Sequence, residues 1–204
     1  MYPLKNPKID PFCIYYNLFN QKELKSLFEC TSDIESKFAK INRFDKKETS
    51  EINRNFRNCK LKTVILNKNT NWIYEKIIDK INFINYKNYN MVIKFIEALN
   101  LLEYSFDENK NDSGFYKPHV DDDGLYSDHN YSMIRKLSFV VQLSSPEDYD
   151  GGKLILYNNS EEHESPNDIG TLITFPSSIM HEVTPVTRGI RHSLVGWIVG
   201  PNVL

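Results

Sequence analysis

The sequence predicts an α+β fold that is mainly β, in which N-terminal helices support a C-terminal sheet structure of the sandwich or barrel type. Before residue 100, apolar residues recur at helical spacing; after it, short apolar runs are separated by turn signals such as Asp150-Gly151-Gly152. No proline- or glycine-rich linker and no internal repeat divides the chain. We therefore expect one domain over residues 1–204, with a support region over about 1–94 and a sheet core over about 95–204.

Composition excludes some classes of partner. The 204 residues are 40 % hydrophobic and carry a net charge of −2, so neither nucleic acid nor an anionic membrane is expected as a partner. The three cysteines, Cys13, Cys30 and Cys59, form no CxxC pattern, and we expect buried thiols in a reducing compartment. Neither a secretory signal nor a membrane-length apolar run is visible, which favours a cytoplasmic protein.

Two helices are expected in the N-terminal part. A short apolar strand and turn over residues 9–19 precede Asn20, which is typical of a helix N-cap with Glu23 as its capping-box partner. A second helix should begin at Asn69 or Thr70. Each helix has an apolar stripe that we expect to be core, and the stripes consist of Leu24, Leu27 and Phe28 in the first and Trp72, Ile73, Ile77, Ile78 and Ile81 in the second.

The remaining chain reads as strands and polar loops. Apolar runs predict strands at 61–66, 93–105 (one or two strands), 137–143, 153–157, 171–175 and 191–199. Polar loops are expected at 107–114, 122–131 and 158–168. On the strand at 137–143, alternate residues form one wholly apolar face, which we expect to pack on the N-terminal helices, and the partly polar face of Ser138, Val140 and Gln142 should look into the barrel.

The segment Phe115–Asp121 contains the strongest chemical signal. On an extended chain His119 and Asp121 point to the same face, so an imidazole and a carboxylate lie side by side. His181, at a boundary between a strand and a turn, is the best candidate for a third ligand. Two histidines and one carboxylate form the facial triad that holds Fe(II) in non-haem oxygenases and leaves positions for a co-substrate and dioxygen.

Other metal-site interpretations are weaker. His129 and His163 lie in polar segments, and His192 is out of phase with its neighbour Arg191. The acidic run before Gly124 lacks the spacing of a calcium-binding loop. A zinc hydrolase could use the same three ligands with a bound water.

A second feature lies in the last predicted strand. Arg191, Ser193 and Trp197 share one face of a strand that is mostly apolar on both sides. Burying an arginine costs free energy unless an anion pairs with it. The two parallel N–H groups of its guanidinium suit a carboxylate. An internal salt bridge is one explanation. The other is that Arg191, assisted by Ser193, holds the distal carboxylate of 2-oxoglutarate, with Gln142 close to this co-substrate.

Taken together, these segments resemble the prolyl 4-hydroxylase-like Fe(II)/2-oxoglutarate oxygenases, and most closely their PKHD-type hydroxylase branch, a bacterial and phage group. The resemblance covers about residues 95–200. It is carried in order by Tyr104, Tyr116-Lys117-Pro118-His119-Val120-Asp121, Arg135-Lys136-Leu137-Ser138, Val141-Gln142-Leu143-Ser144, Tyr149-Asp150-Gly151-Gly152-Lys153-Leu154, Gly170-Thr171-Leu172, Phe175-Pro176-Ser177 and His181 to Ser193.

The resemblance implies a fold, cofactors and roles. The fold would be a double-stranded β-helix (jelly roll) whose catalytic core spans about 95–204, with iron at one open end held by His119, Asp121 and His181. Arg191 and Tyr104 would bind 2-oxoglutarate, and L-ascorbate would keep the iron reduced. Halogenase relatives lack the carboxylate ligand, so Asp121 favours hydroxylation.

The resemblance also bears on the substrate. It suggests a peptidyl proline, and a peptide or protein is favoured over a small molecule. We expect Tyr116, Arg135 and Trp197 on the substrate side, and the loops 107–114 and 122–134 at the mouth of the site. A free amino acid or other small molecule is the alternative substrate, and a non-catalytic jelly-roll binding module is the alternative of another class. The segment Arg54–Asn58 receives no role.

Overall fold

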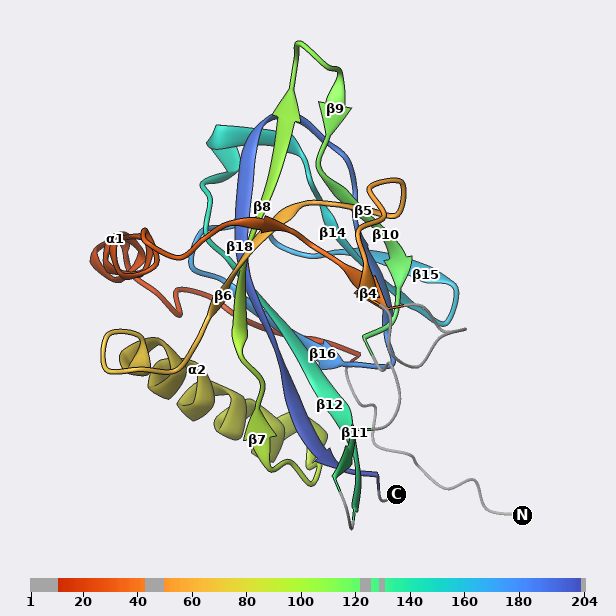
Figure 1. Cartoon of the computed structure of the whole chain (residues 1–204). Coiled ribbons are helices and arrows are strands. Elements are labelled where there is room, and N and C mark those ends of the chain that lie inside the picture. The colour runs from red at the N-terminus through yellow and green to blue at the C-terminus, as the bar shows by residue number, and fades with distance from the viewer. Residues whose placement is uncertain (1–10, 43–49, 122–125, 129–130, 203–204) are drawn as a thin grey trace.

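The computed structural model describes residues 11–42, 50–121, 126–128 and 131–202 (Figure 1). Its helices are α1 (Gln21–Cys30) and α2 (Asn71–Ile84), and α2 continues into a π-helical turn, Asn85–Tyr89. The rest is mostly antiparallel β structure, so the predicted mainly β fold with N-terminal helices is confirmed. None of the helices in these described ranges is both long and apolar enough to cross a membrane.

Among the described residues, the larger sheet has eleven strands. Its strands follow the order β1 (Cys13–Tyr15), β16 (Leu172–Pro176), β12 (Tyr131–Gln142), β18 (Val186–Pro201), β8 (Leu99–Asp107), β6 (Lys60–Val64) and β2 (Lys37–Phe38). Short strands extend it: β11 (Tyr126–Asp128) pairs with β12, β9 (Asp112–Ser113) with β8, and both β7 (Phe95–Ile96) and β13 (Tyr149–Gly151) with β18.

A smaller sheet faces the larger one and carries the strands that matter for the site. Its order is β15 (Glu161–Glu164), β14 (Leu154–Asn158), β17 (Met180–Val183), β10 (Phe115–His119) and β5 (Arg57–Asn58). A separate two-stranded ribbon joins β3 (Ile41–Asn42) and β4 (Ser50–Glu51). In Figure 1 both helices lie on one side of the long strands β8, β18 and β12, and β10, β14 and β15 lie on the other.

The larger sheet therefore has two buried faces. Its outer face packs on the helices: Phe139, Val141 and Leu143 of the β12 region share a core cluster with Leu27 of α1 and Ile77 of α2, so the predicted apolar face is confirmed. The inner face packs on the smaller sheet. There the shared cluster includes Leu102, Val140, Leu154, Leu156, Ile173 and Val183. Side chains from both sheets meet in the space between them, so a binding site can form there.

Several local predictions hold. Asn20 caps α1, and the capping box with Glu23 is present in both directions. The segment 93–105 forms two strands, β7 and β8. No disulfide joins the three cysteines, all of which lie in the described part of the chain; Cys59 is buried as expected, whereas Cys13 and Cys30 are only half-buried. The second helix begins at Asn71, one residue after Thr70, whose hydroxyl donates to the Ile65 carbonyl instead of capping the helix.

The predicted loops are the main correction. Each of the three contains residues of a short strand, β9 in 107–114, β11 in 122–131 and β15 in 158–168. These strands are rich in charged residues, as in Glu161–Glu164, and lack the apolar alternation that marks a half-buried strand. The hairpin of β8 and β9 precedes β10, whereas His119 ends it, so the segment 107–114 lies at the end of β10 away from His119.

Candidate metal centre and co-substrate pocket

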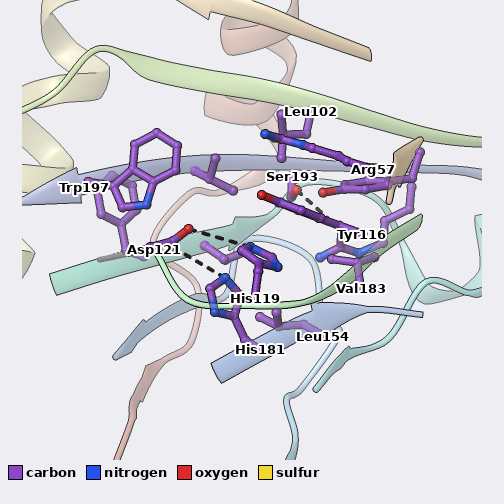
Figure 2. A pocket seen from close by; sticks show the side chains of 15 residues that line it. Arg57, Leu102, Tyr116, His119, Asp121, Leu154, His181, Val183, Ser193 and Trp197 are labelled. Atoms are coloured by element: carbon purple, nitrogen blue, oxygen red, sulfur yellow. Dashed lines mark hydrogen bonds and ion pairs between the residues drawn. The ribbon is translucent and has the colours of Figure 1, made fainter. Parts of the chain in front are cut away.

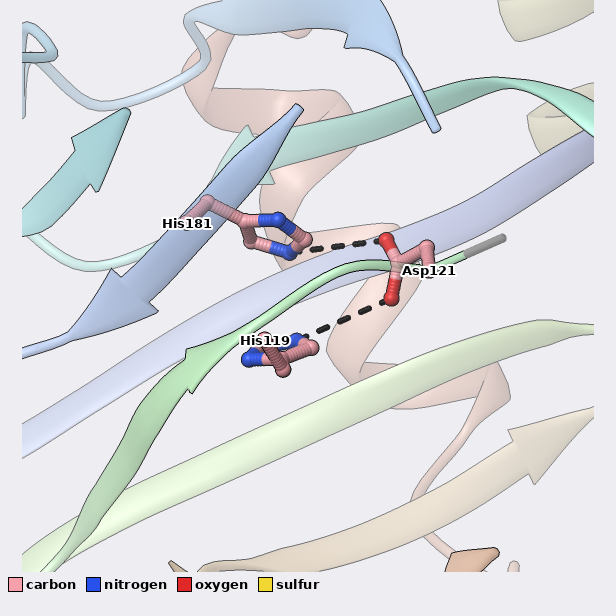
Figure 3. A group of neighbouring side chains, drawn as sticks. All are labelled: His119, Asp121 and His181. Atoms are coloured by element: carbon pink, nitrogen blue, oxygen red, sulfur yellow. Dashed lines mark ion pairs between the residues drawn. The ribbon is translucent and has the colours of Figure 1, made fainter. Parts of the chain in front are cut away.

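The three predicted metal ligands meet where β10 and β17 pair. His119 and His181 are directly opposite each other in this antiparallel pair, and Asp121 follows two residues after His119 (Figure 3). The Nε2 atoms of the histidines lie 3.7 Å from Asp121 Oδ1 and 3.4 Å from Asp121 Oδ2, respectively. One donor atom from each residue lies within 4.8 Å of the others. This set of two imidazoles and a carboxylate could hold a divalent metal.

Both imidazoles are oriented by the backbone. Nδ1 of His119 lies 2.8 Å from the carbonyl oxygen of Lys117, and Nδ1 of His181 lies 3.0 Å from that of Ile179. A carbonyl can only accept, so Nδ1 carries the proton in each ring and Nε2 offers its lone pair toward the centre. A hydrogen bond of this kind on the outer nitrogen is typical of metal-ligating histidines.

The carboxylate of Asp121 is held from the larger sheet. Ser138 on β12 donates its hydroxyl to Asp121 Oδ2 at 2.8 Å, and the indole of Trp197 on β18 also hydrogen-bonds to Asp121. The backbone N–H of Asp121 donates to the carbonyl of Ser177 at 3.0 Å. Ser138 was not among the predicted site residues. The position of Ser138 on the partly polar face of the predicted strand 137–143 was the sequence signal that could have indicated this role.

The protonation states suit a metal. Burial lowers the pKa of His119 to about 3, and the neighbouring His181 acts in the same direction. Burial opposes ionisation of Asp121, but interactions with the two histidines and the hydrogen bonds from Trp197 and Ser138 outweigh it and lower its pKa. At neutral pH His119 is therefore a neutral imidazole and Asp121 a carboxylate, the forms that ligate metals.

Removing the Ser138 hydroxyl should loosen this centre. In Ser138→Ala the carboxylate loses one of its two side-chain donors, and we expect Fe(II) affinity to fall about 10- to 100-fold. An anaerobic titration with Fe(II) measures this. The matched control is Ser165→Ala, because the buried Ser165 hydroxyl has no hydrogen-bond partner in the described structure. Equal affinity in both variants would contradict the assigned role of Ser138.

A pocket opens beside the centre (Figure 2). Its lining includes the three ligands, Tyr104, Tyr116, Arg191, Ser193, Trp197 and Arg57, together with aliphatic residues of both sheets. Trp197 lies beside Asp121 on one side of the pocket, and Arg57 extends from β5 beside Tyr116 on the other.

Arg191 is the buried cation of this pocket. The residue is 1 % exposed. On β18 it stands directly opposite Tyr104 of the neighbouring strand β8. Nη2 donates to Gln142 Oε1 at 2.9 Å and Nη1 makes a long contact of 3.5 Å with Ser193 Oγ. Nε has no partner, and no carboxylate of the described residues pairs with the guanidinium.

The unsatisfied guanidinium fits an anionic co-substrate. A buried charge without a counter-ion is costly, so its presence points to an anion that completes the site. Burial raises the pKa of Tyr104, so its phenol is neutral at physiological pH and can donate to a carboxylate. The dicarboxylate 2-oxoglutarate, whose other end can chelate a metal, meets both requirements of the pocket.

The structure separates the other predicted residues into two groups. Tyr104, Ser193, Tyr116 and Trp197 line the pocket, and the ring of Tyr116 stacks on His119 with centroids 3.5 Å apart. Gln142 does not line the pocket. Its side-chain oxygen accepts a hydrogen bond from Arg191, and its amide nitrogen donates to the Pro166 carbonyl at 3.1 Å.

Arg135 is not free to meet a substrate. It forms a two-pronged ion pair with Glu97, at 2.8 Å for both contacts, and its guanidinium lies 3.9 Å from the centre of the Trp197 ring. The remaining histidines add no ligand: His163 and His192 lie outside the pocket lining, and His129 lies outside the described residues, as do Asp122, Asp123 and Gly124.

Arg57 is the pocket residue that the sequence did not reveal. It belongs to β5, a strand of two residues, within a segment that gave no periodic signal. Only the pairing of β5 with β10 brings it to the pocket.

Comparisons with known proteins agree with this geometry. Residues 99–199 match the 2OG-Fe(II) oxygenase superfamily. Over 83 residues the chain is 43 % identical to a PKHD-type hydroxylase of Synechococcus sp. (strain JA-2-3B'a(2-13)), which covers 41 % of this chain and 37 % of that protein. Over 91 residues it is 40 % identical to the PKHD-type hydroxylase YbiX of Escherichia coli, covering 45 % and 39 %. Each alignment thus spans less than two fifths of the curated relative.

Two solved structures share the fold over most of the chain. A prolyl-4-hydroxylase of Pseudomonas putida superposes with a TM-score of 0.65 at 19 % identity and covers 92 % of both chains. A prolyl hydroxylase of Trichoplax adhaerens, solved with a peptide fragment of hypoxia inducible factor, gives a TM-score of 0.69 at 17 % identity and covers 92 % of this chain and 83 % of that one. Residues 99–199, which contain the three ligands and Arg191, belong to the 2OG-Fe(II) oxygenase superfamily.

Proposed function

We propose that this protein is an Fe(II)- and 2-oxoglutarate-dependent dioxygenase that hydroxylates a C–H bond, and that residues 1–204 form one oxygenase domain. The observation that carries the proposal is the meeting of the His119–Asp121–His181 cluster and the unsatisfied Arg191 in one pocket. A zinc hydrolase gives Arg191 no role. A non-catalytic binding module gives no reason for three ligands beside it.

Each residue then has a task. His119, Asp121 and His181 would hold Fe(II), which supplies the activation of dioxygen when bound. Arg191, with Tyr104 and Ser193, binds the distal carboxylate of 2-oxoglutarate and so fixes its orientation toward the ligands. Ser138 and Trp197 orient the Asp121 carboxylate, and Gln142 positions Arg191. The aliphatic lining, such as Val140 and Leu154, excludes water.

For the substrate we propose a peptidyl proline, with L-ascorbate as the reductant that keeps the iron active. Support comes from relatives and structural neighbours that are named as hydroxylases, one of them solved with a peptide. A free amino acid or another small molecule is the second candidate. The observation that favours it is the buried guanidinium of Arg57 in the pocket lining, which could pair with the carboxylate of such a molecule.

The reaction is tested without knowing the substrate. Purified protein is loaded anaerobically with Fe(II), given 2-oxoglutarate and then exposed to dioxygen, and succinate is measured. We expect slow succinate formation that needs both Fe(II) and 2-oxoglutarate and stops when Zn(II) replaces iron. Absence of succinate from wild-type protein would overturn the oxygenase proposal.

The substrate requires a second assay. Incubation of the Fe(II)-loaded enzyme with a library of proline-containing peptides should yield a product heavier by one oxygen, located on proline by mass spectrometry. If no peptide is modified while succinate still forms, the peptidyl-proline proposal is wrong and the oxygenase proposal stands.

A further inference from the structure

Arg57 is held in the pocket by a network on the outside of β5. The side-chain amide of Asn58 donates to Asp112 Oδ1 at 2.9 Å and to the Ser113 carbonyl at 2.7 Å, and Arg54 Nε donates to Asn58 Oδ1 at 2.9 Å. Arg54 also forms an ion pair with Asp112. This network fixes β5 to the β9 hairpin, so Arg57 enters the pocket from a fixed strand.

The guanidinium of Arg57 has no acidic partner within the described ranges of the chain. Its contacts are with Cys59 Sγ at 3.3 Å and, at 3.4 Å, the carbonyl of Lys40. The residue is only 9 % exposed. Buried arginines without a paired carboxylate are rare, because the cost of removing the charge from water is not offset.

Arg57 lies at the Tyr116 end of the pocket, across the Tyr116 ring from His119. Its guanidinium carbon is 4.5 Å from the centre of the Tyr116 ring, and that ring in turn stacks on His119 with an interplanar angle of 18°. The Tyr116 ring thus separates the guanidinium from His119, and Arg57 lines the same pocket as the three metal ligands.

The pocket, with its metal and co-substrate bound, would carry one positive charge that no negative charge balances. Among the described lining residues, Asp121 is the single carboxylate, whereas Arg57 and Arg191 are both cationic. A divalent metal and a doubly charged 2-oxoglutarate cancel each other, and Asp121 balances one arginine. One positive charge remains in the pocket, and it can attract a further anion.

Building on the proposed function, we propose that Arg57 binds a carboxylate of the primary substrate. The guanidinium fork suits a planar, two-pronged carboxylate better than the carbonyl of an internal peptide bond. The substrate then carries a free carboxylate as well as the C–H bond that reacts. Two kinds of molecule share this chemistry: a free amino acid or small carboxylic acid, and the C-terminal residue of a peptide.

The test compares acids with their amides. Wild-type protein, Arg57→Gln and the control Arg188→Gln are assayed with the free amino acids, with prolyl peptides ending in a free C-terminus, and with the matching primary amides. Arg188 is exposed and pairs with Asp150, away from the pocket. Binding is read as a shift in melting temperature of protein loaded with Zn(II) and N-oxalylglycine, an unreactive analogue of 2-oxoglutarate, and turnover as stimulated succinate release.

We expect at least one acid to bind at least about tenfold more tightly than its amide, and this preference to disappear in Arg57→Gln but not in Arg188→Gln. The free amino acids and the peptides distinguish the two sources of the carboxylate. Arg57→Lys keeps the charge without the fork and should retain part of the preference. It also serves if Arg57→Gln does not fold.

Three results would overturn the inference: acids and amides that bind wild-type protein equally, no acid that binds at all, or a rise in the 2-oxoglutarate requirement of the Arg57 variants. The last would assign Arg57 to the co-substrate. Failure of the proposed function would look different, because wild-type protein would then neither bind N-oxalylglycine nor release succinate without any substrate.

Discussion

Replacing His181 with alanine is expected to lower Fe(II) affinity by at least about a hundredfold and to reduce 2-oxoglutarate-dependent succinate release to background. The variant removes one of three converging ligands and leaves His119 and Asp121 with too few donors for a facial site. Anaerobic Fe(II) titration and the succinate assay measure the two effects.

The control for this experiment is His163→Ala. His163 lies on β15, outside the pocket lining, and its loss should change neither iron affinity nor succinate release. The melting temperature of both variants shows whether the fold is retained. If His181→Ala bound iron and released succinate like the wild type, the metal centre would be wrongly placed.

The second large effect is expected from Arg191→Ala. Loss of the guanidinium removes the charge-assisted contact with the distal carboxylate, so the 2-oxoglutarate requirement should rise about 10- to 100-fold. Iron binding should change little, since Arg191 contacts Gln142 and Ser193 and none of the three ligands. Titration of 2-oxoglutarate in the succinate assay gives the first quantity and anaerobic Fe(II) titration the second.

Arg191→Lys provides the matched comparison. It keeps a positive charge but loses the two-pronged geometry, so its 2-oxoglutarate requirement should fall between those of the wild type and Arg191→Ala. Loss of iron binding or of the folded state in Arg191→Ala, with an unchanged 2-oxoglutarate requirement in Arg191→Lys, would assign Arg191 a structural role.

Much of the metal centre and the helices could be predicted from the sequence, because the relevant signals are local. The spacing of His119 and Asp121 places both side chains on one face of an extended chain, whatever lies around them. The same alternation puts Arg191, Ser193 and Trp197 on one face of β18. Asn20 and Glu23 satisfy the N-terminus of α1 within a single turn.

Other features depend on which strands become neighbours, and the sequence could not supply them. Gln142 shares the polar face of β12 with Ser138, yet Ser138 meets Asp121 while Gln142 lies behind Arg191. Arg135 is neutralised by Glu97, a partner far away in the chain. Alternation predicts the face of a side chain, but only the packing of both sheets decides what that face meets.

The sequence by itself therefore determined the class of fold, the three metal ligands as a hypothesis and the cation Arg191. The tertiary structure alone brought Arg57 to the pocket, through a two-residue strand that pairs with β10. So short a strand has no periodic signal of its own. Its place follows from hydrogen bonds between distant segments, which depend on the folded chain as a whole.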